Sequence, residues 1–184
     1  MNDLPDAGQP GGALTRSQLE DWDTTYLADA AARWRQLAAE SEELFEWHRQ
    51  NVHAPGGAEW SGAAGEAAGE QVSADAVVVR KQGDIQREAS EIAENGCRDI
   101  RLAVGQVLEA ISAAEEEGFK VSEDLKVRDT RRIDVSTMAV RYTASREHAE
   151  DIRWHCERLM QAEIYLGQRL EGKALELAAI QFSL

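Results

Sequence analysis

Proline and aromatic residues are scarce in this sequence, and each shortage narrows the choice of fold. The only prolines, Pro5, Pro10 and Pro55, lie in the first third of the chain. The residues from 56 to 184 therefore contain none of the strongest helix breaker. Aromatic residues make up only 6% of the chain, whereas Ala, Glu, Leu, Arg and Gln are abundant. This mixture is typical of long helices and coiled coils. We therefore predict an all-α fold, an elongated bundle of long antiparallel helices.

Positive charge, cysteine and long apolar runs are also in short supply. The chain has 20 Lys and Arg against 34 Asp and Glu, a net charge of -14, and such a field repels nucleic acid and anionic lipid headgroups. Cys97 and Cys156 are too few for a disulfide framework, and we interpret them as buried free thiols. No apolar run approaches the ~18 residues that span a bilayer. The amino terminus also lacks a secretory signal. We predict no nucleic-acid partner and no transmembrane segment, so export would need a route that accepts folded helices.

Apolar residues that recur at intervals of three and four predict three long helices, at about 17–53, 60–117 and 135–181. Thr15 or Ser17 is placed to cap the first helix. Its apolar stripe is expected to continue without a break through Leu19, Trp22, Tyr26, Ala30, Trp34, Leu37 and Leu44 or Phe45.

The remaining segments complete the predicted organisation. Residues 1–14 hold two prolines and three glycines without periodicity, which predicts a disordered leader. Residues 118–134 are predicted to be a loop, formed either by two short extended pieces over the helix tips or by irregular chain. We expect residues 15–184 to form a single helical-bundle domain.

Patterns that carry catalysis are missing. His48 and His53 are five residues apart, and His148 and His155 are seven apart. Two imidazoles about 10 Å apart on a helix cannot share a metal ion without ligands from elsewhere. The sequence has no Gly-rich phosphate loop, and neither cysteine follows a nucleophile-bearing turn or has an oriented base beside it. We therefore predict no catalytic residue, no metal site and no cofactor.

One interior stretch, residues 54–69, combines a Pro-Gly-Gly break, an isolated tryptophan and a run of Ala and Gly. The break is predicted to end the first helix, and Trp60 to enter the second. We expect Trp60 to fill the gap that the turn opens. Gly62 and the small residues that follow are expected to let another helix backbone come close. The candidate interaction residues are Trp60, Gly62, Gly65 and Gly69, and their spacing alone also fits a plain helical hairpin with an aromatic plug.

The first helix, the turn bearing Trp60-Ser61-Gly62 and the second helix resemble the WXG superfamily, the small helical-hairpin substrates of mycobacterial and actinobacterial type VII (ESX) secretion systems. Residues from about 15 to 130 are similar to the amino-terminal helical domain of larger mycobacterial ESX-associated proteins. The resemblance implies a protein that travels through, or assembles with, type VII machinery, as a homo- or hetero-oligomer with a helical partner. It also implies a secreted or envelope-associated location.

One feature of that family is absent. Its substrates commonly carry a Tyr-x-x-x-Asp/Glu export signal after a helix, but Tyr26, Tyr142 and Tyr165 are followed four residues later by Ala30, Arg146 and Arg169. The signal then belongs to a partner or lies beyond Leu184.

The leading expectation is a non-enzymatic secretion-associated protein or substrate that acts through helix–helix interactions at the Trp60 turn. One alternative is the amino-terminal delivery domain of a larger secreted toxin or enzyme. The other is a cytosolic coiled-coil adaptor or secretion chaperone.

Overall fold

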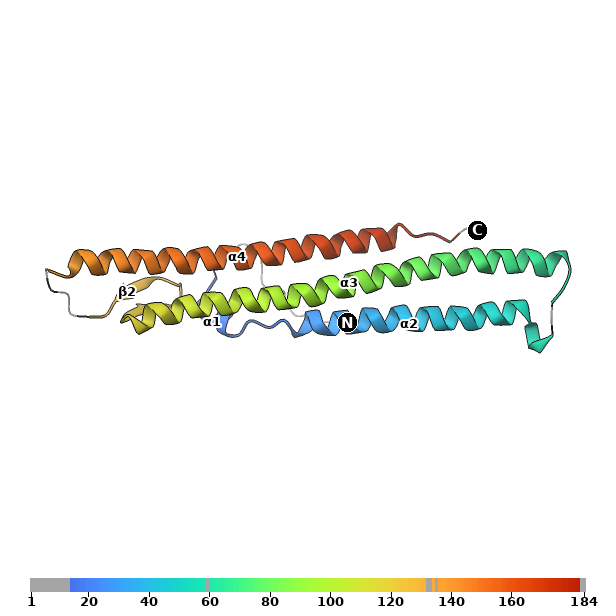
Figure 1. The fold of residues 1–184 in the computed structure, drawn as a ribbon, viewed down its shortest axis with the longest axis horizontal. Helices are drawn as coiled ribbons and strands as arrows, with labels where there is room; N and C mark the ends of the chain where they lie inside the picture. Colours follow the sequence, from blue (N-terminus) through green and yellow to red (C-terminus); the bar gives the residue numbers. More distant parts are fainter. Residues whose placement is uncertain (1–13, 59, 132–133, 135, 183–184) are drawn as a thin grey trace, which may run out of the picture. The chain divides into compact units, whose positions relative to one another are not determined.

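The computed structural model describes residues 14–58, 60–131, 134 and 136–182, and its architecture is all-α, as predicted. The helices are α1 (Arg16–Glu20), α2 (Thr25–His53), α3 (Ala63–Glu116) and α4 (Met138–Ala178) (Figure 1). A 3-10 turn, η1 (Pro55–Gly57), follows α2, and two short strands, β1 (Phe119–Val121) and β2 (Val127–Asp129), separate α3 from α4. The predicted disordered leader falls, apart from Leu14, outside the described residues.

The start of the first helix agrees with the sequence, but its continuity does not. Thr15 forms a capping box with Gln18, in which the Thr15 hydroxyl accepts from the Gln18 N–H at 3.2 Å and the Thr15 N–H donates to Gln18 Oε1 at 3.0 Å. The helix then ends at Glu20 and a new one begins at Thr25. The prediction of one unbroken helix over 17–53 is therefore wrong.

A tertiary contact accounts for the break. Thr24 is buried, and the Cys97 thiol on α3 donates to its carbonyl and lies 3.4 Å from its hydroxyl oxygen. After the break, α2 buries a face that differs from the predicted apolar stripe. This buried face is formed by Leu27, Ala31 and Ala38. Leu37, which the predicted stripe placed in the core, is exposed.

The chain forms two compact units, and α3 and α4 each run from one unit into the other. The first comprises the described residues up to Asp23 together with Ile100–Gln161, and the second comprises Thr24–Asp99 with the described residues from Ala162 onward. The expectation of a single domain over 15–184 stays a prediction.

In the second unit, α2 and the end of α4 each run antiparallel to α3. Arg87 pairs with Glu42 at 2.7 Å, and Arg35 with Glu94, so later residues of α3 meet earlier residues of α2. On the other side, Lys173 of α4 pairs with Glu88 at 2.6 Å. A Cβ added at Gly96 would lie 2.5 Å from a methyl carbon of Leu166, so the missing side chain permits close packing of α4 on α3.

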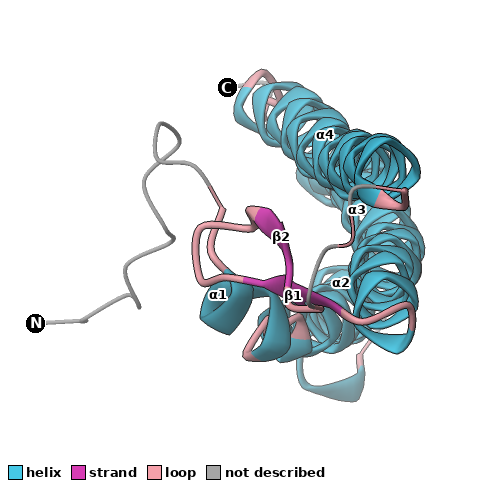
Figure 2. Ribbon diagram, turned by 90° about the vertical axis from the view of Figure 1, so that its left-hand side faces the viewer, coloured by secondary structure: helices cyan, strands magenta, loops and turns pink. Residues whose placement is uncertain are grey.

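The first unit contains the two strands, which lie within the segment between α3 and α4. Of the two forms considered for residues 118–134, the extended one is present: β1 and β2 form an antiparallel hairpin in which Phe119 lies opposite Asp129 and Val121 opposite Val127. Figure 2 shows this hairpin beside α1. The Arg16 N–H donates to the Glu123 carbonyl at 2.9 Å, which ties α1 to the hairpin. Phe119 and Val121 are buried, as are Ile100, Val107, Ile152 and Leu159 of the flanking helices.

Candidate functional site

The turn between α2 and α3 is built largely from backbone. Gly56 and Gly57 have φ of 66° and 82°, a left-handed conformation that glycine adopts without the strain that a side chain would add. The Gly57 N–H donates to the Ala54 carbonyl at 3.0 Å, and the Trp60 N–H donates to the His53 carbonyl at 3.3 Å. The paired glycines therefore reverse the chain, as the Pro-Gly-Gly sequence predicted.

Trp60 lies on this turn, next to the start of α3. The residue is 45% exposed. Its backbone and ring lie over Gly65, where an added Cβ would come 2.5 Å from the Trp60 carbonyl oxygen and 3.4 Å from Cγ of the ring. The expected plug is thus a half-exposed aromatic surface, and Gly65 is the residue that makes room for it.

Gly62 and Gly69 have different roles from each other. Gly62 has a φ of 102°, which favours glycine, and apart from its chain neighbours no atom of the described residues lies within 4 Å of an added Cβ. The expected approach of another helix at Gly62 stays a prediction. The Gly62 carbonyl accepts from the Glu66 N–H at 3.0 Å in the first turn of α3. At Gly69, which is buried, an added Cβ would lie 3.1 Å from the His53 ring of α2. Trp60 and Gly62 lie in the turn and Gly65 and Gly69 in the first two turns of α3, and among these glycines an added Cβ would meet close neighbours at Gly65 and Gly69.

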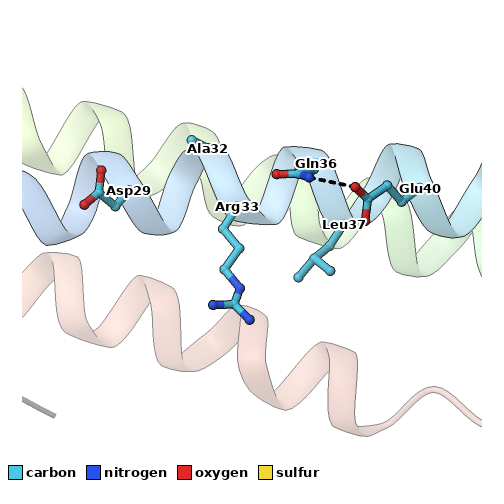
Figure 3. A pocket seen from close by; sticks show the side chains of 6 residues that line it. All are labelled: Asp29, Ala32, Arg33, Gln36, Leu37 and Glu40. Atoms are coloured by element: carbon cyan, nitrogen blue, oxygen red, sulfur yellow. Dashed lines mark hydrogen bonds between the residues drawn. The ribbon is translucent and has the colours of Figure 1, made fainter. Parts of the chain in front are cut away.

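A second exposed feature lies on α2 and was missed by the sequence interpretation. We define the outer face of α2 as Arg33, Leu37, Glu40, Glu43, Leu44 and Trp47. These residues line two shallow depressions together with Asp29, Ala32 and Gln36. Figure 3 shows the part around Arg33, Leu37 and Glu40. The steps of four and three from position 33 to position 47 were visible in the sequence, but the stripe assigned Leu37 and Leu44 to the core.

Charges near the end of α2 are paired locally. Arg49 donates two hydrogen bonds of 2.8 Å to the Glu46 carboxylate. Chiefly because of these bonds, and secondarily because of one from Gln50, the pKa of Glu46 falls to about 2. The Glu46 side chain is 49% exposed, so solvent screens this pair.

The two cysteines differ in burial, and the surroundings of Cys156 do not activate its thiol. Cys97 is buried and Cys156 is partly buried, and both are free. Burial, and then the charge of Glu157, raises the pKa of Cys156, which disfavours the nucleophilic thiolate. Within the described part of the chain, no three His, Cys, Asp or Glu side chains are grouped to hold a metal ion. None of its helices combines the length and apolar character needed to cross a bilayer.

The fold places this chain among the all-α helical-bundle proteins. Three mycobacterial proteins are each 32% identical to it over 170 residues. They are the uncharacterized proteins Rv2077c and MT2137 of Mycobacterium tuberculosis, from strains H37Rv and CDC 1551, and Mb2102c of Mycobacterium bovis. The similar region covers 92% of this chain and 52% of each relative, so the chain spans about half the length of these relatives. No family model matches the chain, and no solved structure does.

Proposed function

We propose that this protein is a non-enzymatic, type VII (ESX) secretion-associated helical protein or substrate that acts through helix–helix contacts at the Trp60 turn. The observation that carries the proposal is the indole of Trp60, half exposed at the corner between two antiparallel helices. The resemblance of this corner to the WXG superfamily supports the secretion route. The similar proteins are mycobacterial, and mycobacteria have type VII secretion systems, which also favours this proposal.

The geometry suits recognition by a partner helix. Trp side chains present a large apolar surface with a polar N–H and are enriched among residues that dominate binding energies. Next to Trp60, the first turns of α3 carry the exposed residues Ala63, Ala64 and Ala67, so little side-chain bulk keeps a second backbone away. A partner can therefore contact the ring without opening the core of the unit.

Export of a tagged full chain from a mycobacterial host tests the proposal. We expect Trp60→Ala to lower the amount in the culture filtrate by about tenfold or more, the loss typical of an interface anchor, with helical circular dichroism retained. Trp154→Ala, at a tryptophan of α4 that is also about half exposed, is the matched control and should export normally. A strain without the type VII ATPase should retain the wild-type chain.

Two results would contradict the proposal. One is equal export of the Trp60→Ala and wild-type chains, and the other is export that persists without the ATPase. Confinement of the wild-type chain to the cytosol of a secretion-competent strain would favour an adaptor or chaperone role instead.

The length of the relatives favours a second candidate, a helical delivery domain for another segment of a longer protein. The chain corresponds to about half of each relative. The test is to express the Mycobacterium tuberculosis relative whole and without the region similar to this chain. Export of the remaining half only when it is joined to the helical region would support delivery, whereas independent export would rule it out.

A further inference from the structure

The outer face of α2 carries large apolar side chains that are not buried in the folded unit. Leu44 and Trp47 are 68% and 67% exposed, and Leu37 also lies on the surface. The buried face of the same helix is formed by Leu27, Ala31 and Ala38, so α2 has one face for its own unit and another that stays open. Positions 33, 37, 40, 44 and 47 alternate steps of four and three, the spacing with which a helix presents side chains to a second helix.

The charges on this face are mainly negative and lack ionic partners. Asp29, Glu40 and Glu43 line the depressions, and Arg33 is their only basic lining residue. Glu40 accepts a hydrogen bond of 2.7 Å from the neutral Gln36 amide, which Figure 3 shows as a dashed line. Among the described residues, none of these four charged groups forms an ion pair within 4.0 Å.

Carboxylates elsewhere on α2 contrast with those of the outer face. Glu42 pairs with Arg87 of α3, and Glu46 pairs with Arg49 on its own helix. The outer face therefore keeps its negative charge available. A second copy of the chain would bring the same acidic face and a net charge of -14 with it, and this repulsion disfavours self-association through the face.

We propose that the outer face of α2 is a docking site for an amphipathic helix of another protein, with apolar residues at coiled-coil spacing and Lys or Arg beside them. The partner's apolar residues cover Leu44 and Trp47, and its basic residues face Glu40 and Glu43. Arg33, one turn before Leu37, favours an acidic residue at the corresponding end of the partner and so selects its direction. This site excludes the Trp60 turn and does not depend on the secretion route.

Calorimetric titration of the full chain with designed helical peptides tests the proposal. The first peptide has about three heptads with Leu at the two core positions and Lys beside them, and the second replaces each Lys with Glu. We expect saturable one-to-one binding of the Lys peptide and at least about tenfold weaker binding of the Glu peptide. Leu44→Ala and Trp47→Ala should each raise the Kd of the Lys peptide by about tenfold. Leu102→Ala, at a similarly exposed leucine of α3, should leave that Kd within about twofold.

Two charge-reversal variants distinguish binding through this face from attraction by the overall negative charge of the chain. Glu40→Lys/Glu43→Lys should reverse the preference toward the Glu peptide. Glu70→Lys/Glu91→Lys makes the same change in net charge at exposed positions of α3 and should keep the original preference. Circular dichroism establishes that each variant is folded.

Three outcomes would overturn the proposal. Equal weakening by both charge-reversal variants would mean that the Lys peptide senses only the field of the whole chain. Equal affinity for both peptides would remove the charge argument. A dimer in light scattering that Leu44→Ala/Trp47→Ala dissociates would show that a second copy occupies the face. Trp60→Ala should not change peptide affinity, so failure here and failure of the secretion proposal are distinguishable.

Discussion

Two corners join successive long helices, one between α2 and α3 and the other between α3 and α4. They differ in the exposure of their aromatic residue. At the Trp60 turn, which precedes α3, glycine backbone makes the reversal and the aromatic ring is 45% exposed. At the hairpin corner, residues 117–131 after α3, the aromatic Phe119 is only 3% exposed. The Arg141 guanidinium lies 3.8 Å above the centre of its ring.

Polar groups reinforce the hairpin corner and are fewer at the Trp60 turn. Arg141 pairs with Asp129 at 2.7 Å and donates to the Glu117 carbonyl at 3.0 Å, which satisfies one of the acceptors left open at the end of α3. Arg16 of α1 pairs with Glu115 in the same unit. These side chains of the hairpin corner are thus engaged in contacts within the chain, whereas the indole at the Trp60 turn remains partly accessible to solvent.

Truncation of the aromatic residue should destabilise the two corners to very different extents. Phe119→Ala should lower the free energy of unfolding by about 3–5 kcal/mol, because it removes a buried ring and leaves a cavity. Trp60→Ala should lower it by less than about 1 kcal/mol, since solvent already reaches the ring. Urea unfolding followed by circular dichroism measures both. Equal losses would mean that Trp60 is part of the core.

Much of the helical framework was predictable because it depends on local sequence. A proline-free chain with regular apolar spacing gave the end of α2 and both bounds of α3 and α4 to within about three residues, the usual uncertainty of such bounds. The break after Glu20 was not predictable, because no Pro or Gly marks it. It coincides with the burial of Thr24 against Cys97, a residue far away in the sequence.

For the candidate site, the sequence identified the location but not the roles of the residues. Pro55 and the glycines that follow it signal a turn through their backbone preferences, so its position could be read directly. Whether Trp60 fills a gap depends on what surrounds the turn, and periodicity does not contain that information. Likewise, Leu44 fits an apolar stripe by spacing, but its side chain is exposed in the folded unit.

Both corners contain a glycine with a positive φ. Gly62 and Gly118 have φ of 102° and 85°. Gly62→Ala and Gly118→Ala should therefore each cost about 1–2 kcal/mol of strain in the folded state. Gly118→Ala should cost more, because its new Cβ would also meet the Arg131 side chain, whereas the space around Gly62 is open.

Gly105→Ala is the matched control for both glycine variants. Gly105 lies within α3, and beyond its own helix backbone no atom of the described residues lies within 4 Å of an added Cβ, so alanine should stabilise by about 0.5–1 kcal/mol. Unfolding midpoints in urea rank the three variants. A neutral Gly62→Ala would show that the start of α3 adjusts, and that the backbone of the Trp60 turn is not fixed by its glycine.

Two carboxylates, Asp129 and Glu46, have similarly lowered pKa values but differ in exposure. Hydrogen bonds from Arg141, and then from the Arg131 N–H, lower the pKa of Asp129 from 3.8 to about 2. Bonds from Arg49 lower the pKa of Glu46 from 4.5 to about 2. Each folded-state pKa is below its unfolded value. Each group's stabilisation is therefore complete above pH ~5 and is lost as the pH falls from about 4 through about 2.

Exposure decides which of the two losses is measurable. The Asp129 side chain is 11% exposed and is held by a guanidinium that also covers Phe119, whereas the Glu46 side chain is 49% exposed and solvent screens its pair. Urea midpoints measured between pH ~5 and ~2.5 should fall less steeply for Asp129→Asn than for the wild type. Glu46→Gln should follow the wild-type curve closely. If Glu46→Gln instead flattens the curve as much as Asp129→Asn does, the ion pair near the end of α2 is as firmly held as the one at the hairpin.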